Sequence, residues 1–214
     1  MKPPRLILIS DPAFLDELVV RCMRAVAHAL PPGTFGVQLR DKQRPPAALR
    51  VAASFFRVAT RAAGVPLFVN GALEVARDSG ADGVHLGGGA GSVRQARELL
   101  GRKTWVSVAA HTDDDVVRAK NDGADAVLVS PIFATRSHGA AGYRKVPRGV
   151  DAIRSAREHA GTAMSVYALG GVTFGSAQAC AEAGADGVAL IRALLTSTEP
   201  GRAARAVHDA FLGR

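Results

Sequence analysis

A five-residue pattern of Gly, Ala, Asp, a small residue and Val occurs three times in the chain, at 80–84, 123–127 and 184–188. Each copy lies between an alanine-rich segment with helical spacing and a short apolar run. Glycine suits the left-handed turn that follows a helix, and an aspartate readily hydrogen-bonds turn amides. The pattern therefore predicts a repeated helix–turn–strand unit in which the aspartates are structural rather than catalytic.

Short apolar runs alternate with longer helical segments along the whole chain. We expect strands at 6–10, 35–40, 66–70, 83–86, 105–109, 126–130, 164–169 and 187–191. We expect helices at 14–30, 46–63, 73–79, 92–100, after a Thr112 N-cap, and at 150–159, 176–183 and 203–212.

Strict strand–helix alternation predicts a parallel sheet with helices outside, and strands this apolar are typical of parallel sheets buried on both faces. Eight such units predict an α/β fold, a single (β/α)8 TIM barrel spanning residues 1–214. A doubly wound open sheet would need a glycine-rich dinucleotide loop after the first strand, and Ser10-Asp11-Pro12 offers none.

The chain is basic, with 27 Lys and Arg against 19 Asp and Glu, yet these cations are scattered and aromatic residues make up only 5%. Nucleic acid is therefore a poor candidate partner, and anionic metabolites fit the charge better. The sequence lacks the uninterrupted apolar stretch of about 20 residues that a membrane span needs, and it lacks the pattern of a signal peptide. We expect a cytoplasmic protein that does not bind a membrane.

A polar cluster follows the second expected strand, where catalytic residues of barrels collect. Gln38 and Arg40 share one strand face, and Lys42 lies just beyond them. An arginine fork and a lysine point charge together suit an anionic ligand. We therefore expect Gln38, Arg40 and Lys42 to bind substrate.

Adjacent glycines close the seventh strand, a place where many barrels bind phosphate. Gly170 and Gly171 allow backbone N–H groups to approach an anion, and Arg192 follows the eighth strand, where it can contact the same phosphate or lie on the surface. His111 and His138 follow the fifth and sixth strands and are candidate general acids or bases. His85 lies within a strand, which favours a hydrogen-bonded core histidine.

The chain resembles the thiamine phosphate synthase family and its sister, the thiazole tautomerases. The motifs that carry the resemblance occur in the family order and cover nearly the whole chain: Val37-Gln38-Leu39-Arg40-Asp41-Lys42, Pro66-Leu67-Phe68-Val69-Asn70, Gly80-Ala81-Asp82-Gly83-Val84-His85-Leu86-Gly87, Ser130-Pro131-Ile132-Phe133-Ala134-Thr135, Ala168-Leu169-Gly170-Gly171-Val172 and Gly184-Ala185-Asp186-Gly187-Val188-Ala189.

The resemblance implies a barrel that joins hydroxymethylpyrimidine pyrophosphate to a thiazole phosphate, with magnesium assisting departure of pyrophosphate. By position, it assigns Gln38, Arg40, Lys42 and Asn70 to the pyrimidine and its pyrophosphate. On the thiazole phosphate side it implies contacts from Thr135, Gly171 and Ile191, and we also expect Ser137 to bind substrate. Arg192 stands where the family has a serine after the eighth strand.

The chain departs from the synthase pattern at the residues that hold the metal. Gly71 stands where the synthases have an aspartate, and Ala90 stands at the second acidic position. Neither side chain has an oxygen for a hard divalent ion, so we assign no metal ligand, although Asp11 or Asp41 offers a substitute carboxylate. A serine before the fifth-strand histidine is replaced by Ala109, and the phosphate-binding lysine after the sixth strand by His138.

Three functional hypotheses follow. The first is a synthase-type transferase with a divergent magnesium site. The second is a magnesium-independent thiazole phosphate tautomerase, for which Asn70-Gly71 fits but Pro131 replaces the catalytic histidine of that branch, so that His111 or His138 must act instead. The third is a non-catalytic barrel that binds thiamine-related phosphates, and a homodimer is left open in each case.

Overall fold

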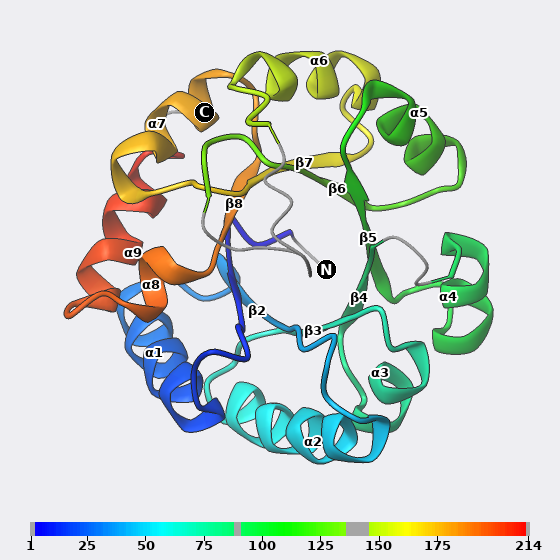
Figure 1. The fold of residues 1–214 in the computed structure, drawn as a ribbon, viewed down its shortest axis with the longest axis vertical. Coiled ribbons are helices and arrows are strands. Elements are labelled where there is room, and N and C mark those ends of the chain that lie inside the picture. Colours follow the sequence, from blue (N-terminus) through cyan, green and yellow to red (C-terminus); the bar gives the residue numbers. More distant parts are fainter. Residues whose placement is uncertain (1–2, 88–90, 136–145, 213–214) are drawn as a thin grey trace.

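The computed structural model describes residues 3–87, 91–135 and 146–212 and has eight parallel strands that close into a barrel in chain order. β1 pairs with both β2 and β8, and Figure 1 shows the helices as an outer ring. The predicted (β/α)8 barrel is confirmed. The strands are β1 (Leu6–Ile9), β2 (Phe35–Leu39), β3 (Leu67–Asn70), β4 (Gly83–Leu86), β5 (Trp105–Ala110), β6 (Ala126–Val129), β7 (Ser165–Leu169) and β8 (Gly187–Leu190).

The helices cover the outer face of the sheet, and their apolar stripes form the main core with the strands. Their bounds are α1 (Asp16–Ala29), α2 (Pro46–Ala62), α3 (Leu73–Ser79), α4 (Val93–Leu100), α5 (Asp113–Asn121), α6 (Asp151–Ala160), α7 (Ala177–Glu182), α8 (Arg192–Leu195) and α9 (Pro200–Asp209). Thr112 caps α5 as expected, with its side chain accepting from the Asp115 amide. Within the described ranges, no helix combines the length and the apolar character needed to cross a bilayer.

A second, smaller core fills the inside of the barrel. The rings of Phe68 and Trp105 have centroids 4.6 Å apart, and those of Trp105 and Tyr167 are 6.2 Å apart. A Cβ on Gly83 would lie 2.5 Å from the Trp105 carbonyl oxygen, and a Cβ on Gly187 would lie 2.7 Å from the Tyr167 ring. In these two copies of the repeated pattern, backbone carbonyl oxygens and aromatic rings occupy the space that a Cβ would need.

The aspartates of the repeated pattern each join two neighbouring units at the N-terminal end of the barrel. Asp82 Oδ2 accepts from the Leu67 amide at 2.8 Å and from Arg57, while the Asp82 amide donates to the Leu67 carbonyl oxygen at 2.8 Å. The other two copies repeat these contacts, Asp125 with Val106 and Arg97, and Asp186 with Val166 and Arg157.

This arrangement corrects one detail of the prediction. The aspartates are structural, as expected, but their partners are strand amides and helix arginines rather than turn amides. The glycine that precedes each of them has a positive φ, between 62° and 105°, as the left-handed turn requires.

Removing the carboxylate of Asp82 tests its structural role. In Asp82→Ala the buried Leu67 amide loses its acceptor and Arg57 loses its counter-ion, so we expect unfolding to become easier by about 2–3 kcal/mol. Chemical denaturation measures the change. Asp78→Ala is the matched control, because Asp78 forms only exposed ion pairs with arginines, and it should leave the midpoint nearly unchanged. Equal loss in both variants would contradict this role.

Candidate functional site

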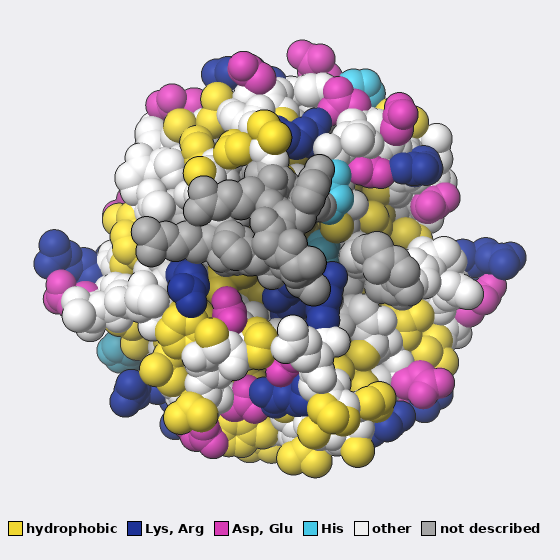
Figure 2. All heavy atoms as spheres, in the orientation of Figure 1, with side chains coloured by type: hydrophobic (Ala, Val, Ile, Leu, Met, Phe, Trp, Pro, Cys, Tyr) yellow, Lys and Arg dark blue, Asp and Glu magenta, His cyan; other side chains and the backbone are white. Residues whose placement is uncertain are grey.

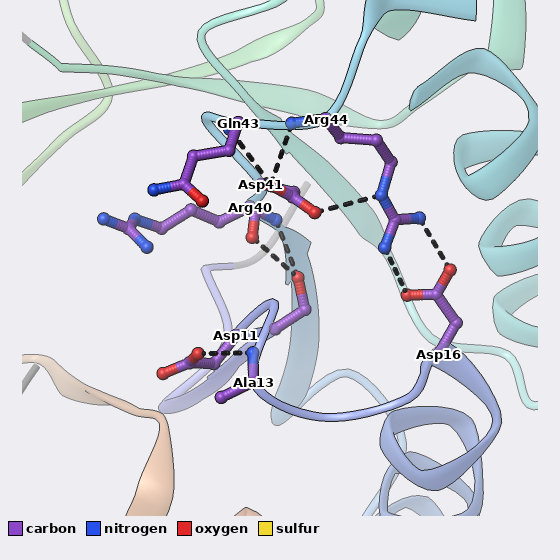
Figure 3. A network of polar contacts seen from close by, with 8 residues as sticks. Asp11, Ala13, Asp16, Arg40, Asp41, Gln43 and Arg44 are labelled. Carbon is purple, nitrogen blue, oxygen red and sulfur yellow. Dashed lines mark hydrogen bonds and ion pairs between the residues drawn. The ribbon is translucent and has the colours of Figure 1, made fainter. Parts of the chain in front are cut away.

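The end of β2 brings Gln38 and Arg40 to the mouth of the barrel, the end at which the strands finish. Ser10 Oγ accepts from the Arg40 amide at 2.8 Å, and the Ser10 amide donates to the Gln38 carbonyl oxygen at 2.9 Å. Gln38 is buried, and Arg40 lies at the rim with its guanidinium directed away from this backbone contact (Figure 3). The predicted strand-face pair is therefore held by the neighbouring strand β1.

The loop after β2 is held by a network of hydrogen bonds and ion pairs that engages Asp41 of the loop and Asp16 of α1 (Figure 3). Asp41 accepts from the Gln43 and Arg44 amides, both at 3.1 Å, and from Arg44 Nε at 3.0 Å. Arg44 also forms a two-pronged contact with Asp16, at 2.7 and 3.1 Å. The hydrogen bond with Asp16, opposed by partial burial and assisted by Asp41, raises the pKa of Arg44. The network leaves Lys42 pointing across the mouth, with Nζ 4.0 Å from where a Cβ on Gly87 would lie.

A buried histidine lies beneath these cations. His85 of β4 aligns with Asn70 of β3 and Ser107 of β5, and its Nδ1 lies 2.9 Å from Ser107 Oγ. Burial, assisted by the charges on Lys42, Arg40 and His111, lowers the pKa of His85 to about 4. His85 is therefore the neutral, hydrogen-bonded core histidine that was expected, and its surroundings are positive.

His111 is exposed at the end of β5 and is oriented through both its backbone and its ring. Its ring Nδ1 lies 2.8 Å from the Ser130 carbonyl oxygen, so Nδ1 carries the proton and Nε2 is the basic nitrogen of the neutral ring. The His111 amide donates to Asp115 at 2.8 Å. Burial acts to raise the pKa of Asp115, but hydrogen bonds from His111, Arg118 and Thr112 outweigh it and hold the pKa at about 2. This geometry suits an acid–base group.

The glycines after β7 pack against the segment after β6. A Cβ on Gly171 would lie 2.4 Å from the Ala134 carbonyl oxygen, and one on Gly170 would lie 2.9 Å from Pro131. The Phe133 amide donates to the Gly170 carbonyl oxygen at 2.9 Å. Close backbone packing therefore requires these glycines, whether or not a phosphate also approaches them.

Arg192 begins the short helix α8, directly after Ile191, and this helix was not expected from the sequence. Its guanidinium lies over the Phe14 ring of the loop after β1, 5.7 Å from the ring centroid. Within the described residues, Arg40, Lys42 and Arg192 have no carboxylate within salt-bridge distance, which leaves three cations facing the end of the barrel where ligands bind. Figure 2 shows Lys, Arg and His side chains near the centre of this end.

Some predicted site residues lie outside the described ranges of the chain. His138 and Ser137 lie in the gap 136–145, and Ala90 lies in the gap 88–90. Thr135 is the last described residue before the larger gap and is partly buried. The roles predicted for His138, Ser137 and Thr135 therefore stay predictions.

Sequence reasoning missed several partners of the site. Ser107, a polar residue within an apolar strand, was a signal for the contact with His85. The contact of Ser130 with His111 and the stacking of Phe14 beneath Arg192 join segments far apart in the chain, and no local pattern marks them.

The described side chains do not fit the magnesium site of the synthases. No three carboxylates, histidines or cysteines within the described ranges lie close enough to hold a metal ion together. Gly71 supplies no side-chain oxygen, Asp41 is occupied by Arg44 and two amides, and Asp11 Oδ1 accepts from the Ala13 amide at 3.0 Å. The two carboxylates considered as substitutes therefore serve their own loops.

The family model for thiamine monophosphate synthase matches residues 6–194. The chain belongs to this family. The thiamine-phosphate synthase of Chloroflexus aurantiacus is 38% identical over 186 residues, which cover 86% of this chain and 83% of the relative. That of Moorella thermoacetica is 35% identical over 187 residues, 87% of either chain. The expected family is confirmed.

The fold is shared with solved members of the family. Thiamine phosphate pyrophosphorylase from Pyrococcus furiosus superposes with a TM-score of 0.80 at 23% identity, over 97% of this chain and 95% of that one. At this identity the match supports the barrel fold but not a particular reaction.

The low pKa of His85 predicts a specific loss of stability in acid. The unfolded chain takes up a proton near pH 6.5, whereas the folded chain does so only near pH 4. As the pH falls through this window, protonation favours the unfolded state, by up to roughly 3 kcal/mol once the pH is below 4.

Denaturation of the wild type and of His85→Gln at pH 7.5 and pH 5 measures this effect. Other titrating groups are common to both proteins, so the difference between them isolates His85. The wild type should lose more stability than the variant on acidification, and an equal loss would mean that His85 is not held neutral.

Proposed function

We propose that this chain is a transferase of thiamine biosynthesis that joins hydroxymethylpyrimidine pyrophosphate to thiazole phosphate. Membership of the thiamine monophosphate synthase family and the names of its relatives support this activity. One observation at the site supports it most directly. Arg40 and Lys42 lie beside the buried Gln38 at one end of the barrel, and neither has a carboxylate partner among the described residues. These are groups suited to a pyrophosphate ester.

In this reaction the bond between the pyrimidine methylene carbon and the pyrophosphate oxygen breaks, and pyrophosphate keeps the electron pair. The thiazole nitrogen then donates its lone pair to the resulting pyrimidine cation. Arg40 and Lys42 stabilise the negative charge that grows on the leaving group, and this kind of electrostatic assistance is usually the largest contribution to catalysis. Asn70, which aligns with His85, is assigned to the pyrimidine.

The thiazole phosphate is assigned to the ends of β7 and β8, which β1 separates from β2. Gly171 and Ile191 offer backbone groups after β7 and β8, and Arg192 offers a guanidinium whose stacking on Phe14 restricts its movement. In this proposal the two phosphorylated substrates bind at different strand ends of the same mouth. The whole chain, 1–214, acts as one catalytic barrel in this proposal.

Arg40→Gln tests the role of the cations. Purified protein given both phosphorylated precursors should form thiamine phosphate, and the variant should do so at least about tenfold more slowly, because a charge-assisted contact is lost. Arg94→Gln is the control, since Arg94 is an exposed residue of α4. The thiamine phosphate formed is measured by its fluorescence after oxidation. Wild-type protein without product above an enzyme-free reaction would overturn the proposal.

A thiazole phosphate tautomerase is the second candidate, and the geometry of His111 favours it. With Nδ1 donating to Ser130, Nε2 is the nitrogen that takes a proton. His111→Ala should then abolish isomerisation of the thiazole phosphate while its binding persists. Full activity in this variant would remove His111 as the acid–base group.

A further inference from the structure

We infer that the mouth of this barrel binds pyrophosphate in its metal-free form, and that magnesium weakens this binding instead of promoting it. The inference rests on the proposed function only for the choice of pyrophosphate as the ligand. It departs from the magnesium-assisted reaction that the family resemblance implies, because the residues of this chain do not fit that ion.

The first support is the charge balance of the strand ends. Arg40 and Lys42 lie on one strand end and Arg192 on another, and no described carboxylate pairs with any of them. Elsewhere on the molecule arginines are commonly paired, as Arg57, Arg97 and Arg157 are at the opposite end of the barrel. The mouth therefore has cations to offer an anion directly.

The second support is that Asp41, the carboxylate between Arg40 and Lys42 in the chain, is already engaged. Arg44 binds both Asp16 and Asp41, and Asp41 also accepts from two backbone amides of its own loop. Freeing Asp41 for a metal would break the contacts that shape the loop carrying Lys42. A hard divalent ion needs several oxygen ligands, and Gly71 contributes no side-chain oxygen to them.

The third support is the electrostatic environment inside the barrel. His85 lies beneath the cations, and the causes that lower its pKa after burial are the charges of Lys42, Arg40 and His111. Asn70 and Ser107, its neighbours on β3 and β5, are neutral. The same positive charges repel a divalent cation near the mouth, and they do so more strongly than a single proton because the repulsion grows with the charge of the ion.

These observations point to one physical outcome. Free pyrophosphate meets Arg40 and Lys42 with its full negative charge. The magnesium complex carries less negative charge and brings a cation to a site where the described residues hold no group of three metal-ligating side chains. The site therefore distinguishes the two forms of the same ligand.

Calorimetric titration of the intact protein with inorganic pyrophosphate tests the inference. One series contains a chelator and the other contains excess magnesium chloride, with ionic strength matched by sodium chloride because screening alone weakens such contacts. We expect the apparent Kd to rise at least tenfold in magnesium. A lower Kd in magnesium, or no binding in either series, would overturn the inference.

Substitution at Gly71 provides the matched pair of variants. Gly71 has a φ of 74°, a conformation that Asp and Asn tolerate better than other residues, so both variants impose similar backbone strain. Gly71→Asp adds a carboxylate at the end of β3, and it should reduce the magnesium penalty at least threefold. Gly71→Asn adds the same volume without charge and should keep the penalty. The same response in both variants would show that charge at this position does not control the effect.

The binding experiment and the synthesis experiment fail independently. If thiamine phosphate does not form but magnesium weakens pyrophosphate binding, the inference stands and the transferase activity falls. If thiamine phosphate forms faster with magnesium and pyrophosphate binds more tightly with it, the activity stands and the inference falls.

Discussion

The packing of three aromatic rings inside the barrel is the constraint on which the rest of the structure depends. Phe68, Trp105 and Tyr167 come from alternate strands and fill one interior layer, and the Tyr167 hydroxyl donates to the Pro4 carbonyl oxygen at 2.6 Å. This layer fits only because glycines on neighbouring strands leave room for the rings. With this layer filled mainly by aromatic rings, the buried side chains of Gln38 and His85 lie nearer the other end, and the site begins there.

Beneath the mouth, burial is the main cause that holds His85 in its neutral form. The charges on Lys42, Arg40 and His111 act in the same direction. The Asp41–Arg44–Asp16 network holds two carboxylates against one guanidinium, but both carboxylates contact Arg44 rather than Arg40 or Lys42. An anionic ligand would supply the negative charge that no described carboxylate offers to Arg40 and Lys42. Charge is therefore the property of a ligand that this site selects most directly.

The sequence predicted the barrel well because strand–helix alternation and helix-ending glycines are local signals. α3 and β4 have the expected bounds, and Thr112 caps α5 as predicted. The four-residue helix α8 was missed, since so short a segment has no periodicity, and α9 begins three residues early at Pro200, a residue favoured at the first helical position.

The site was predicted in part, for a comparable reason. The positions of Gln38, Arg40 and Lys42 follow from the place where the second strand ends in the sequence. The contacts of Asp41 with Arg44 and of Arg192 with Phe14 depend on how loops approach one another in space. Gly170 and Gly171 were interpreted as phosphate-binding residues, and the packing of Gly171 against Ala134 gives them a second role that only coordinates reveal.

The aspartate–arginine contacts of the repeated pattern lie at the opposite end of the barrel from the cations, and this separation bears on how such proteins change over time. Asp82, Asp125 and Asp186 hold neighbouring strands in register without involving any residue of the mouth. Descendants of a common ancestor can therefore exchange one set of ligand-binding residues for another while inheriting the same scaffold. Similarity along the full length of these chains shows that the scaffold is inherited. Whether the reaction is inherited with it depends on the residues at the strand ends.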